Sequence, residues 1–461
     1  MEKFSTNITR RDFIKQLAMG ATAAAITLAE DKNIFAQDKS DRREGKMTYR
    51  TNKHGDKVSL LGYGCMRWPQ LAKPAPDGNV VDQETVNKLV DFAIEHGVNY
   101  FDTAPVYMQG WSEKSTGIAL KRHPREKFFI ATKLSNTRNN WSREKSIAMY
   151  DNSFKNLQVD YIDYYLLHSV GGGDGLPFLR KRFIDNGMLN FLLNEREKGK
   201  IRNLGFSYHG DIAVFDYLLS KNDLYKWDFV QIQMNYVDWR HAKQINDMNT
   251  NAEYLYNELA ALNIPVIIME PLLGGRLAKL DKHSTGQLLA KTPDNSVASW
   301  AFRFAGSFPN VLTVLSGMTY KQHLEDNIKT FSPLKELNNE EFELLEEIAD
   351  IFASFPTIPC TYCEYCMPCP YGINIPAVFD HYNKCLNEGH VISNEKNKKY
   401  AEARRAFLIG YDRSVPKLRQ ANHCIGCGKC KRHCPQNINI PQKMRKIDEF
   451  VEKLKQSRTN F

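Results

Sequence analysis

The sequence predicts an α/β protein in which a closed (β/α)8 barrel is followed by a small, mainly α-helical domain. Two observations predict this order. Strand-like apolar runs alternate with amphipathic segments through residues 48–331, and eight of the ten cysteines fall between Cys360 and Cys434. The length of 461 residues suits several domains, since an α/β barrel uses about 250 residues as one unit.

Eight strand-like runs, separated by helix-like segments, occupy the predicted barrel. The strands are Val58–Leu61, Val98–Phe101, Phe128–Ala131, Tyr161–Leu167, Ile201–Gly205, Phe229–Gln233, Val266–Met269 and Val311–Leu315, and the clearest helices are Glu84–Glu95, Arg143–Leu157, Ala252–Leu262 and Ser296–Phe304. Repeated βα units of this number favour a closed barrel. The alternative, an open doubly wound sheet, would favour a Gly-x-Gly-x-x-Gly turn after the first strand, and the third glycine is missing from Gly62-Tyr63-Gly64 and the residues that follow.

Composition and charge narrow the functional classes. Hydrophobic residues make up 42% and charged residues 25%, which excludes a disordered or fibrous protein. No apolar run reaches the roughly 20 residues that span a bilayer, so we expect no membrane span in the mature protein. The net charge of +9 contains no block of six like charges, and it favours a solvated surface over a nucleic-acid or lipid partner.

The N-terminal segment has the pattern of an export signal. Arg10 and Arg11 are followed by Phe13-Ile14-Lys15 and then by an apolar, small-residue stretch, Leu17–Ala29, that is too short to span a membrane. This run resembles the twin-arginine signal, which implies export of the folded protein with its cofactors inserted. We therefore expect a signal peptide at 1–37, a charged linker at 38–47 and a periplasmic or otherwise exported protein. The alternative is an ordinary amphipathic first helix.

Polar side chains follow three neighbouring strands of the predicted barrel. Asp102 and Tyr107 follow the second strand, Lys133 ends the third and His168 ends the fourth. Active sites of such barrels lie at this face. A carbonyl that accepts hydride needs a proton, which Tyr107 can donate if Lys133 lowers its pKa; Asp102 can hold Lys133 in place, and His168 can orient the carbonyl. Each residue alone has a structural explanation, but the four together favour catalysis.

Residues 48–331 resemble the aldo-keto reductases. The matching segments are Asn99–Ala104 with Tyr107, Ala131–Lys133, Tyr165–His168, Gly199–Arg202 and Gly205–Ser207. The resemblance implies a catalytic tetrad of Asp102, Tyr107, Lys133 and His168. It also implies a nicotinamide cofactor, NAD(P), whose amide contacts Ser207 and Gln231, and a small carbonyl or alcohol substrate.

The sequence departs from this family at several cofactor positions. Tyr208 replaces the usual Asn, and Met269 stands where an aromatic often stacks on the nicotinamide. Gly317 and His323 replace the usual basic residues of the 2′-phosphate site, which leaves Lys321 as the strong cation nearby. A strong preference for the phosphorylated cofactor is therefore not expected.

Two related cysteine runs follow a predicted bridging helix at 332–356 and mark a second domain at 357–461. The first run holds Cys360, Cys363, Cys366 and Cys369, and the second holds Cys424, Cys427, Cys430 and Cys434; proline follows each fourth cysteine. The first three cysteines are offset by 64 residues, whereas the fourth, and the Ile-Asn-Ile-Pro after it, are offset by 65. These offsets indicate an internal duplication.

The second run fits the ferredoxin pattern for a [4Fe–4S] cluster, and the first is one residue short before its last cysteine. We therefore expect two [4Fe–4S] clusters in an α-helical ferredoxin-like domain. Zinc and disulfides are the alternatives. In two-cluster ferredoxins the fourth cysteine of each run binds the other cluster, which would place Cys434 with the first triplet and Cys369 with the second. Cys65 and Cys385 lie outside both runs.

The fusion resembles an iron–sulfur branch of the aldo-keto reductases. It predicts an exported oxidoreductase with hydride transfer at the barrel and electron transfer through the clusters. A redox protein is the expected electron-transfer partner. The alternative is a non-catalytic electron-transfer or redox-sensing protein that uses the barrel as a scaffold.

Overall fold

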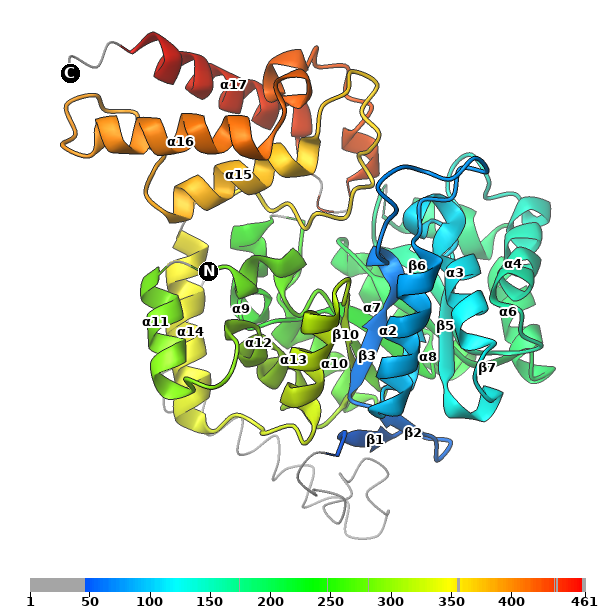
Figure 1. Cartoon of the computed structure of the whole chain (residues 1–461). Helices are drawn as coiled ribbons and strands as arrows, with labels where there is room; N and C mark the ends of the chain where they lie inside the picture. The colour runs from blue at the N-terminus through cyan, green and yellow to red at the C-terminus, as the bar shows by residue number, and fades with distance from the viewer. Residues whose placement is uncertain are drawn as a thin grey trace, which may run out of the picture.

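The computed structural model describes residues 46–457 except 174, 247, 281, 355, 356, 435 and 437. The predicted signal peptide, and all of the linker before Lys46, lie outside the described residues. Figure 1 shows a barrel surrounded by helices, with a layer of C-terminal helices packed over one end. Within the described residues, no helix is both long and apolar enough to cross a membrane.

Eight parallel strands form the closed barrel, in the order β10-β3-β4-β5-β6-β7-β8-β9. They are β3 (Leu61–Gly64), β4 (Tyr100–Asp102), β5 (Phe129–Leu134), β6 (Ile162–Val170), β7 (Ile201–Tyr208), β8 (Phe229–Gln233), β9 (Val266–Met269) and β10 (Val311–Ser316). Each strand pairs with its sequence neighbour, and β10 closes the ring against β3. The predicted (β/α)8 barrel is thereby confirmed.

Helices cover the outside of the barrel. They are α2 (Gln83–Glu95), α3 (Trp111–Leu120), α4 (Arg143–Leu157), α5 (Leu176–Leu179), α6 (Met188–Glu197), α7 (Ile212–Ser220), α8 (Asn222–Tyr225), α9 (Asp238–Ile245), α10 (Ala252–Ala261), α11 (Lys282–Lys291), α12 (Val297–Gly306) and α13 (Lys321–Phe331). Several begin where the sequence supplies a capping side chain: Asp82 accepts a hydrogen bond from the Thr85 amide, and Ser142 accepts one from the Lys145 amide.

The first predicted strand is the one that the structure divides. Val58–Leu61 spans the end of β2 (Lys57–Ser59) and the start of β3, with Leu60 between them. β2 pairs antiparallel with β1 (Tyr49–Thr51), so these residues form a hairpin outside the barrel ring. One apolar run therefore serves two sheets, because the chain turns into the barrel immediately after the hairpin.

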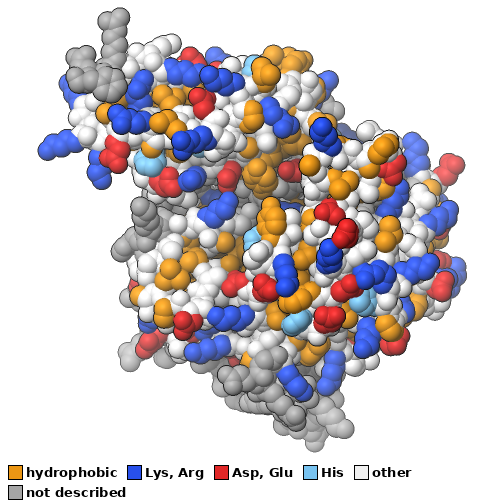
Figure 2. All heavy atoms as spheres, viewed as in Figure 1, with side chains coloured by type: hydrophobic (Ala, Val, Ile, Leu, Met, Phe, Trp, Pro, Cys, Tyr) orange, Lys and Arg blue, Asp and Glu red, His pale blue; other side chains and the backbone are white. Residues whose placement is uncertain are grey.

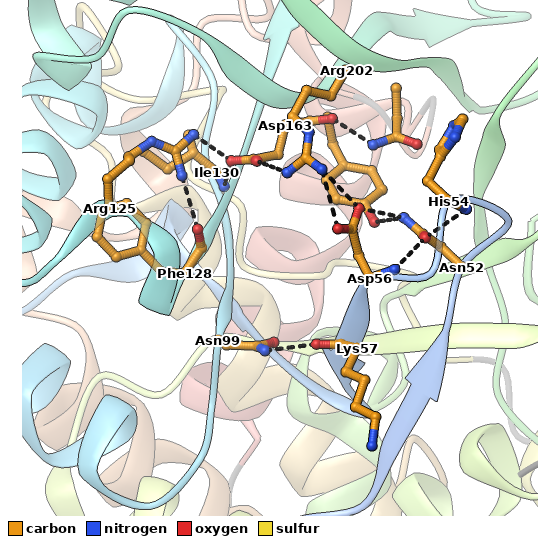
Figure 3. Close-up of polar contacts among 12 residues, drawn as sticks. Asn52, His54, Asp56, Lys57, Asn99, Arg125, Phe128, Ile130, Asp163 and Arg202 are labelled. Carbon is orange, nitrogen blue, oxygen red and sulfur yellow. Dashed lines mark hydrogen bonds and ion pairs between the residues drawn. The ribbon is translucent and has the colours of Figure 1, made fainter. Parts of the chain in front are cut away.

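Figure 3 shows the polar network that ties this hairpin to the lower ends of the strands. Arg202 on β7 donates to Asp56 of the hairpin at 3.1 Å and to Asp163 on β6 at 3.2 Å. Arg125 donates to the other oxygen of Asp163 at 2.5 Å. Because Asp163 is almost fully buried and meets two guanidinium groups, it fixes the lower rim, at the end opposite the predicted site.

The barrel interior is filled by side chains from alternate strands, among them Tyr100, Tyr164, Phe229 and Leu312. A larger apolar layer packs the outer strand faces against the helices. The barrel is thus a solid core and not a pore, so chemistry is confined to its ends.

The C-terminal domain follows α14 (Asn339–Ser354) and contains α15 (Ile375–Asn387), α16 (Tyr400–Ser414) and α17 (Ile440–Gln456), which pack on a separate apolar core. The duplicated Ile-Asn-Ile-Pro motif forms the start of two of these helices. Asn374 is the N-cap of α15 and Asn439 is the N-cap of α17, each with proline in the first turn. The internal repeat is therefore a repeated loop-to-helix unit.

Candidate active site and cysteine sets

Asp102 and Lys133 form the buried base of the predicted catalytic site. Asp102 ends β4, and Lys133 lies near the end of β5. The Lys133 Nζ donates to Asp102 Oδ1 at 2.5 Å and to the Thr103 carbonyl at 2.8 Å. The two residues are only 3% and 1% exposed, so the ammonium is held in one place by a carboxylate that it neutralises.

Tyr107 lies above this ion pair and beside His168. The Lys133 Nζ is 5.0 Å from the centre of the Tyr107 ring, and the Tyr107 and His168 rings meet edge-on with centroids 5.9 Å apart. Burial raises the pKa of Tyr107 well above 10, and Tyr365 and Asp102 raise it further. The pKa of Tyr107 in the protein alone is thus shifted in the direction opposite to the one expected from Lys133. The phenol remains protonated, which is the state that a proton donor needs.

His168 is oriented by neighbours that bind both its ring and its backbone. Ser135 Oγ lies 2.5 Å from His168 Nδ1. Because Nδ1 has this partner, Nε2 is the ring nitrogen left for a substrate at the barrel mouth. Arg182 donates to the His168 carbonyl at 2.6 Å and to the Ser169 carbonyl at 3.0 Å. Burial lowers the pKa of His168 well below 6.5, and Lys133 and Arg182 lower it further. The imidazole is thus neutral at pH 7 and can donate a hydrogen bond from one nitrogen only.

Ser207, near the end of β7, and Gln231, in the middle of β8, are register partners. The Gln231 Nε2 donates to Asp102 Oδ2 at 3.2 Å, and Ser207 Oγ accepts from the Ser169 amide at 2.8 Å. The structure therefore brings both predicted amide contacts to the same barrel end as the tetrad, and connects Gln231 directly to it.

The loop and helix after β10 carry little positive charge that is free for a phosphate. Lys321 pairs with Glu325 on the same helix at 3.2 Å, and its ammonium lies 4.8 Å from the centre of the Phe92 ring. His323 is exposed, and Gly317 has no side chain to contribute. The structure thus gives a physical reason for not expecting strong recognition of a 2′-phosphate.

The eight cysteines of the two runs gather in two mixed sets. Cys360, Cys363, Cys366 and Cys434 line one cavity together with apolar residues that include Ile375, Phe379 and Ile440. We call these four the proximal set because their segments contact the barrel. Burial raises the pKa of the Cys363 thiol to about 12, and Cys434 and Cys360 add to the shift. Thiols in such a place become thiolates only when a metal replaces the proton.

The other four cysteines, Cys369, Cys424, Cys427 and Cys430, form the distal set. Burial raises the pKa of Cys430 to about 11, and the three other members add to it, which places Cys369 among the second run. The fourth cysteine of each run thus lies with the opposite triplet, in agreement with the crossed arrangement. Cys427 is exposed, whereas the other members are half-buried.

The arrangement of the proximal set suits a cubane cluster better than a single metal ion. In a [4Fe–4S] cluster each thiolate binds a different iron, so the four sulfurs surround a volume. The proximal set does so around an apolar cavity. Among the described residues, no three His, Cys, Asp or Glu side chains are positioned to hold a single metal ion.

Loops at the upper end of the barrel hold the segments of the proximal set. Arg67, which follows β3, donates to the Thr361 carbonyl, and Arg276, which follows β9, donates to Thr357 Oγ1. The Asn246 amide donates to the Gln436 carbonyl at 2.9 Å. Gly274 has a φ of +69°, and a Cβ there would collide with the Thr361 backbone, so this close approach requires glycine.

Tyr365, between Cys363 and Cys366, connects the C-terminal domain to the catalytic end. Its hydroxyl donates to the Met66 sulfur at 3.9 Å. Met66 belongs to a short 3-10 helix that packs against the 3-10 turn beginning at Tyr107. Tyr365 also raises the pKa of Tyr107, second only to burial. The proximal set therefore lies over the mouth that contains the tetrad.

Sequence reasoning missed Ser135, Arg182, Arg276 and Tyr365. Ser135 stands two residues after Lys133, and a strand period of two would have placed both side chains on one face. Arg182 contacts residues 13 and 14 positions before it in a different element, and Arg276 contacts a residue 81 positions after it, so neither carries a local signal. Tyr365 stands between Cys363 and Cys366, and the cysteine spacing says nothing about the side chain at that position.

Known protein families match both the barrel and the C-terminal domain of this chain. Residues 60–350 match the family model described as the aldo/keto reductase family, and residues 359–439 match the 4Fe-4S dicluster domain. L-galactose dehydrogenase of Arabidopsis thaliana is 25% identical over 64% of this chain and 91% of its own length. The 9,11-endoperoxide prostaglandin H2 reductase of Trypanosoma cruzi is 25% identical over 62% of this chain and 89% of its own length.

Solved structures show the same fold. An aldo-keto reductase from Bacillus halodurans, in its holo form, superposes with a TM-score of 0.51 at 22% identity over 66% of this chain and 96% of its own. An aldo/keto reductase from Klebsiella pneumoniae, in complex with NADP and acetate, gives a TM-score of 0.51 at 22% identity over 67% and 96%. With its tetrad at the barrel mouth and a family model matched along most of the barrel, the chain belongs to the aldo/keto reductase family and carries a 4Fe-4S dicluster domain after the barrel.

Proposed function

We propose that this oxidoreductase transfers hydride between NAD(P) and a small carbonyl or alcohol at the barrel mouth, and that two [4Fe–4S] clusters exchange electrons with that site. The observation that carries the proposal is the position of the proximal set directly over an assembled Asp102–Lys133–Tyr107–His168 site. We further propose that the protein works after export.

The chain's own groups define the chemistry at the mouth. A nicotinamide bound at the mouth would supply the hydride, and two bound clusters would exchange one electron each, which together with one proton is what the reduction of NAD(P)+ to NAD(P)H requires. Tyr107 gives the proton to the carbonyl oxygen as the carbon is reduced, and takes it back in alcohol oxidation. Neutral His168 donates a hydrogen bond to the same oxygen and fixes its position.

The residues present suit a nicotinamide. Its carboxamide offers an NH2 group that donates and a carbonyl oxygen that accepts, and the Ser207 hydroxyl and Gln231 amide can supply the complementary groups from adjacent strands. The NADP complex of the Klebsiella pneumoniae structure supports the same cofactor class.

The test is to express the full chain in the cytoplasm under anaerobic conditions, and to measure iron, sulfide and co-purified nicotinamide on the same sample. Two clusters with bound or titratable NAD(P) and turnover of a small carbonyl are expected. Clusters without any nicotinamide binding would instead favour a non-catalytic electron-transfer or sensing protein.

Cofactor choice gives a first prediction. With Gly317 and His323 at the usual basic positions and Lys321 paired to Glu325, NADP should be preferred over NAD by less than about tenfold, or about 1.4 kcal/mol. Fluorescence titration of both dinucleotides against the purified protein measures the difference. A hundredfold preference for NADP would show that another cation, outside this loop, binds the 2′-phosphate.

Export gives a second prediction. Changing Arg10 and Arg11 together to Lys keeps the charge but removes the guanidinium groups, which ammonium groups do not replace. The protein should then accumulate in the cytoplasm with its clusters intact, as cell fractionation and immunoblotting would show. Changing Lys15 to Arg is the matched control and should leave export unaltered. Unchanged export of the double variant would contradict the twin-arginine assignment.

A further inference from the structure

The net positive charge of the chain is concentrated around the distal set. Residues 413–447 contain nine Lys and Arg and no Asp or Glu, while the other 53 Lys and Arg are balanced by 53 Asp and Glu. These residues are interspersed with neutral ones, so they form no block of six like charges. Figure 2 shows Lys and Arg side chains spread over the C-terminal domain, at the upper left.

Exposed apolar side chains lie in the same region. Leu418 is 80% exposed, Ile425 is 64% exposed and Tyr371 is 44% exposed. Ile425 directly follows Cys424, and Tyr371 is two residues after Cys369. The Arg419 carbonyl accepts from the Asn374 amide at 3.0 Å, so the turn that carries Leu418 is attached to the segment after Tyr371.

Charged side chains accompany these apolar ones. Lys417, Arg419, Lys429 and Lys431 are all exposed, and the last two flank the distal ligand Cys430. We call the seven residues Tyr371, Leu418, Ile425, Lys417, Arg419, Lys429 and Lys431 the distal face. Exposed apolar and basic side chains in the same loops have the composition of a transient protein-binding surface, in which the charges steer association.

The distal face is also the outer end of the electron path. The proximal set lies over the barrel mouth, whereas the distal set includes the exposed Cys427. A one-electron carrier can therefore approach the distal set without opening the contacts of Arg67 and Arg276 that hold the two domains together.

We propose that the distal face is the docking site for an acidic one-electron carrier protein. The proposal rests on the proposed function, because it assumes a cluster in the distal set. In each encounter one electron leaves the reduced carrier and enters the distal cluster, so the carrier is oxidised and the cluster is reduced. Two encounters deliver two electrons, which together with one proton from solvent reduce NAD(P)+ to NAD(P)H.

The test uses the full-length holoprotein and a chemically reduced, acidic plant-type [2Fe–2S] ferredoxin, whose low reduction potential suits it as the donor. Anaerobic stopped-flow absorbance follows cluster reduction with no carbonyl and no nicotinamide present. Wild type should show a second-order rate that falls steeply with ionic strength. The double variant Lys417→Glu/Lys429→Glu should be at least about tenfold slower at low salt and should approach wild type at high salt.

The matched control is Lys396→Glu/Lys398→Glu, which makes the same charge change on exposed residues of the same domain. Those residues follow the far end of α15, a 13-residue helix about 20 Å long. The control should slow the reaction less than twofold. Iron content and the redox potentials of all three proteins are measured first, because Lys429 is next to Cys430.

Three results would overturn the proposal: a salt-independent rate in wild type, equal slowing in both variants, or tight binding of phosphatidylglycerol vesicles that the distal variant loses while its electron transfer is unchanged. The last would assign the face to a membrane surface. A wild-type protein that holds no clusters would overturn both this proposal and the proposed function. Loss of hydride transfer alone would leave this docking result intact.

Discussion

Tyr107→Phe is expected to lower carbonyl reduction by about 10²–10⁴-fold, because the variant keeps the ring but removes the proton donor. The ring contacts with His168 and Lys133 involve the aromatic face and edge, and phenylalanine preserves them. Nicotinamide affinity and iron content should therefore remain close to those of wild type. Steady-state kinetics with a small aldehyde, together with a dinucleotide titration, measure both quantities.

The matched control for this variant is Tyr365→Phe. Tyr365 is a second tyrosine at the mouth, but its hydroxyl faces the Met66 sulfur and belongs to the other domain. We expect this change to alter KM by less than fivefold and to leave kcat nearly unchanged. If Tyr365→Phe abolished turnover and Tyr107→Phe kept more than half of it, Tyr365 and not Tyr107 would be the proton donor.

The barrel could be predicted because its strands are local signals. β8 and β9 begin and end at the residues that their apolar runs mark, and α4 lies where its period places it. The hairpin could not be separated from β3 in the same way. Hydrophobicity does not show which sheet a residue joins. The apolar run that contributes to both β2 and β3 is therefore predicted as one strand.

The candidate site was predictable where its residues stand at strand ends, and not where it depends on packing. Asp102, Lys133 and His168 could be collected from the sequence because parallel strands bring their carboxyl ends to one face. The direction of the Tyr107 pKa shift could not be predicted, because it depends on the burial of the phenol in the folded protein. The contacts of Arg67 and Arg276 with that domain join residues more than 80 positions apart.

Two double variants, each of which changes two cysteines to alanine, are expected to have the largest effect on the C-terminal domain. In the proposed crossed arrangement, Cys360 and Cys434 bind one cluster, and Cys424 binds the other. Cys360→Ala/Cys434→Ala should then damage a single site and retain about four iron atoms per chain. Cys424→Ala/Cys434→Ala removes one ligand from each site, so both clusters should become labile or convert to three-iron forms.

If each run held its own cluster, the outcomes would be exchanged, because Cys424 and Cys434 would then share a site. Iron and sulfide analysis, with EPR of the oxidised protein for three-iron signals, distinguishes the two arrangements. Cys385→Ala is the control; Cys385 lies in α15 beside His381 and outside both sets, so this variant should keep both clusters. The thermal unfolding midpoint should fall further in the variant that damages both sites, since each crossed site joins the two repeats and its binding free energy contributes to folding.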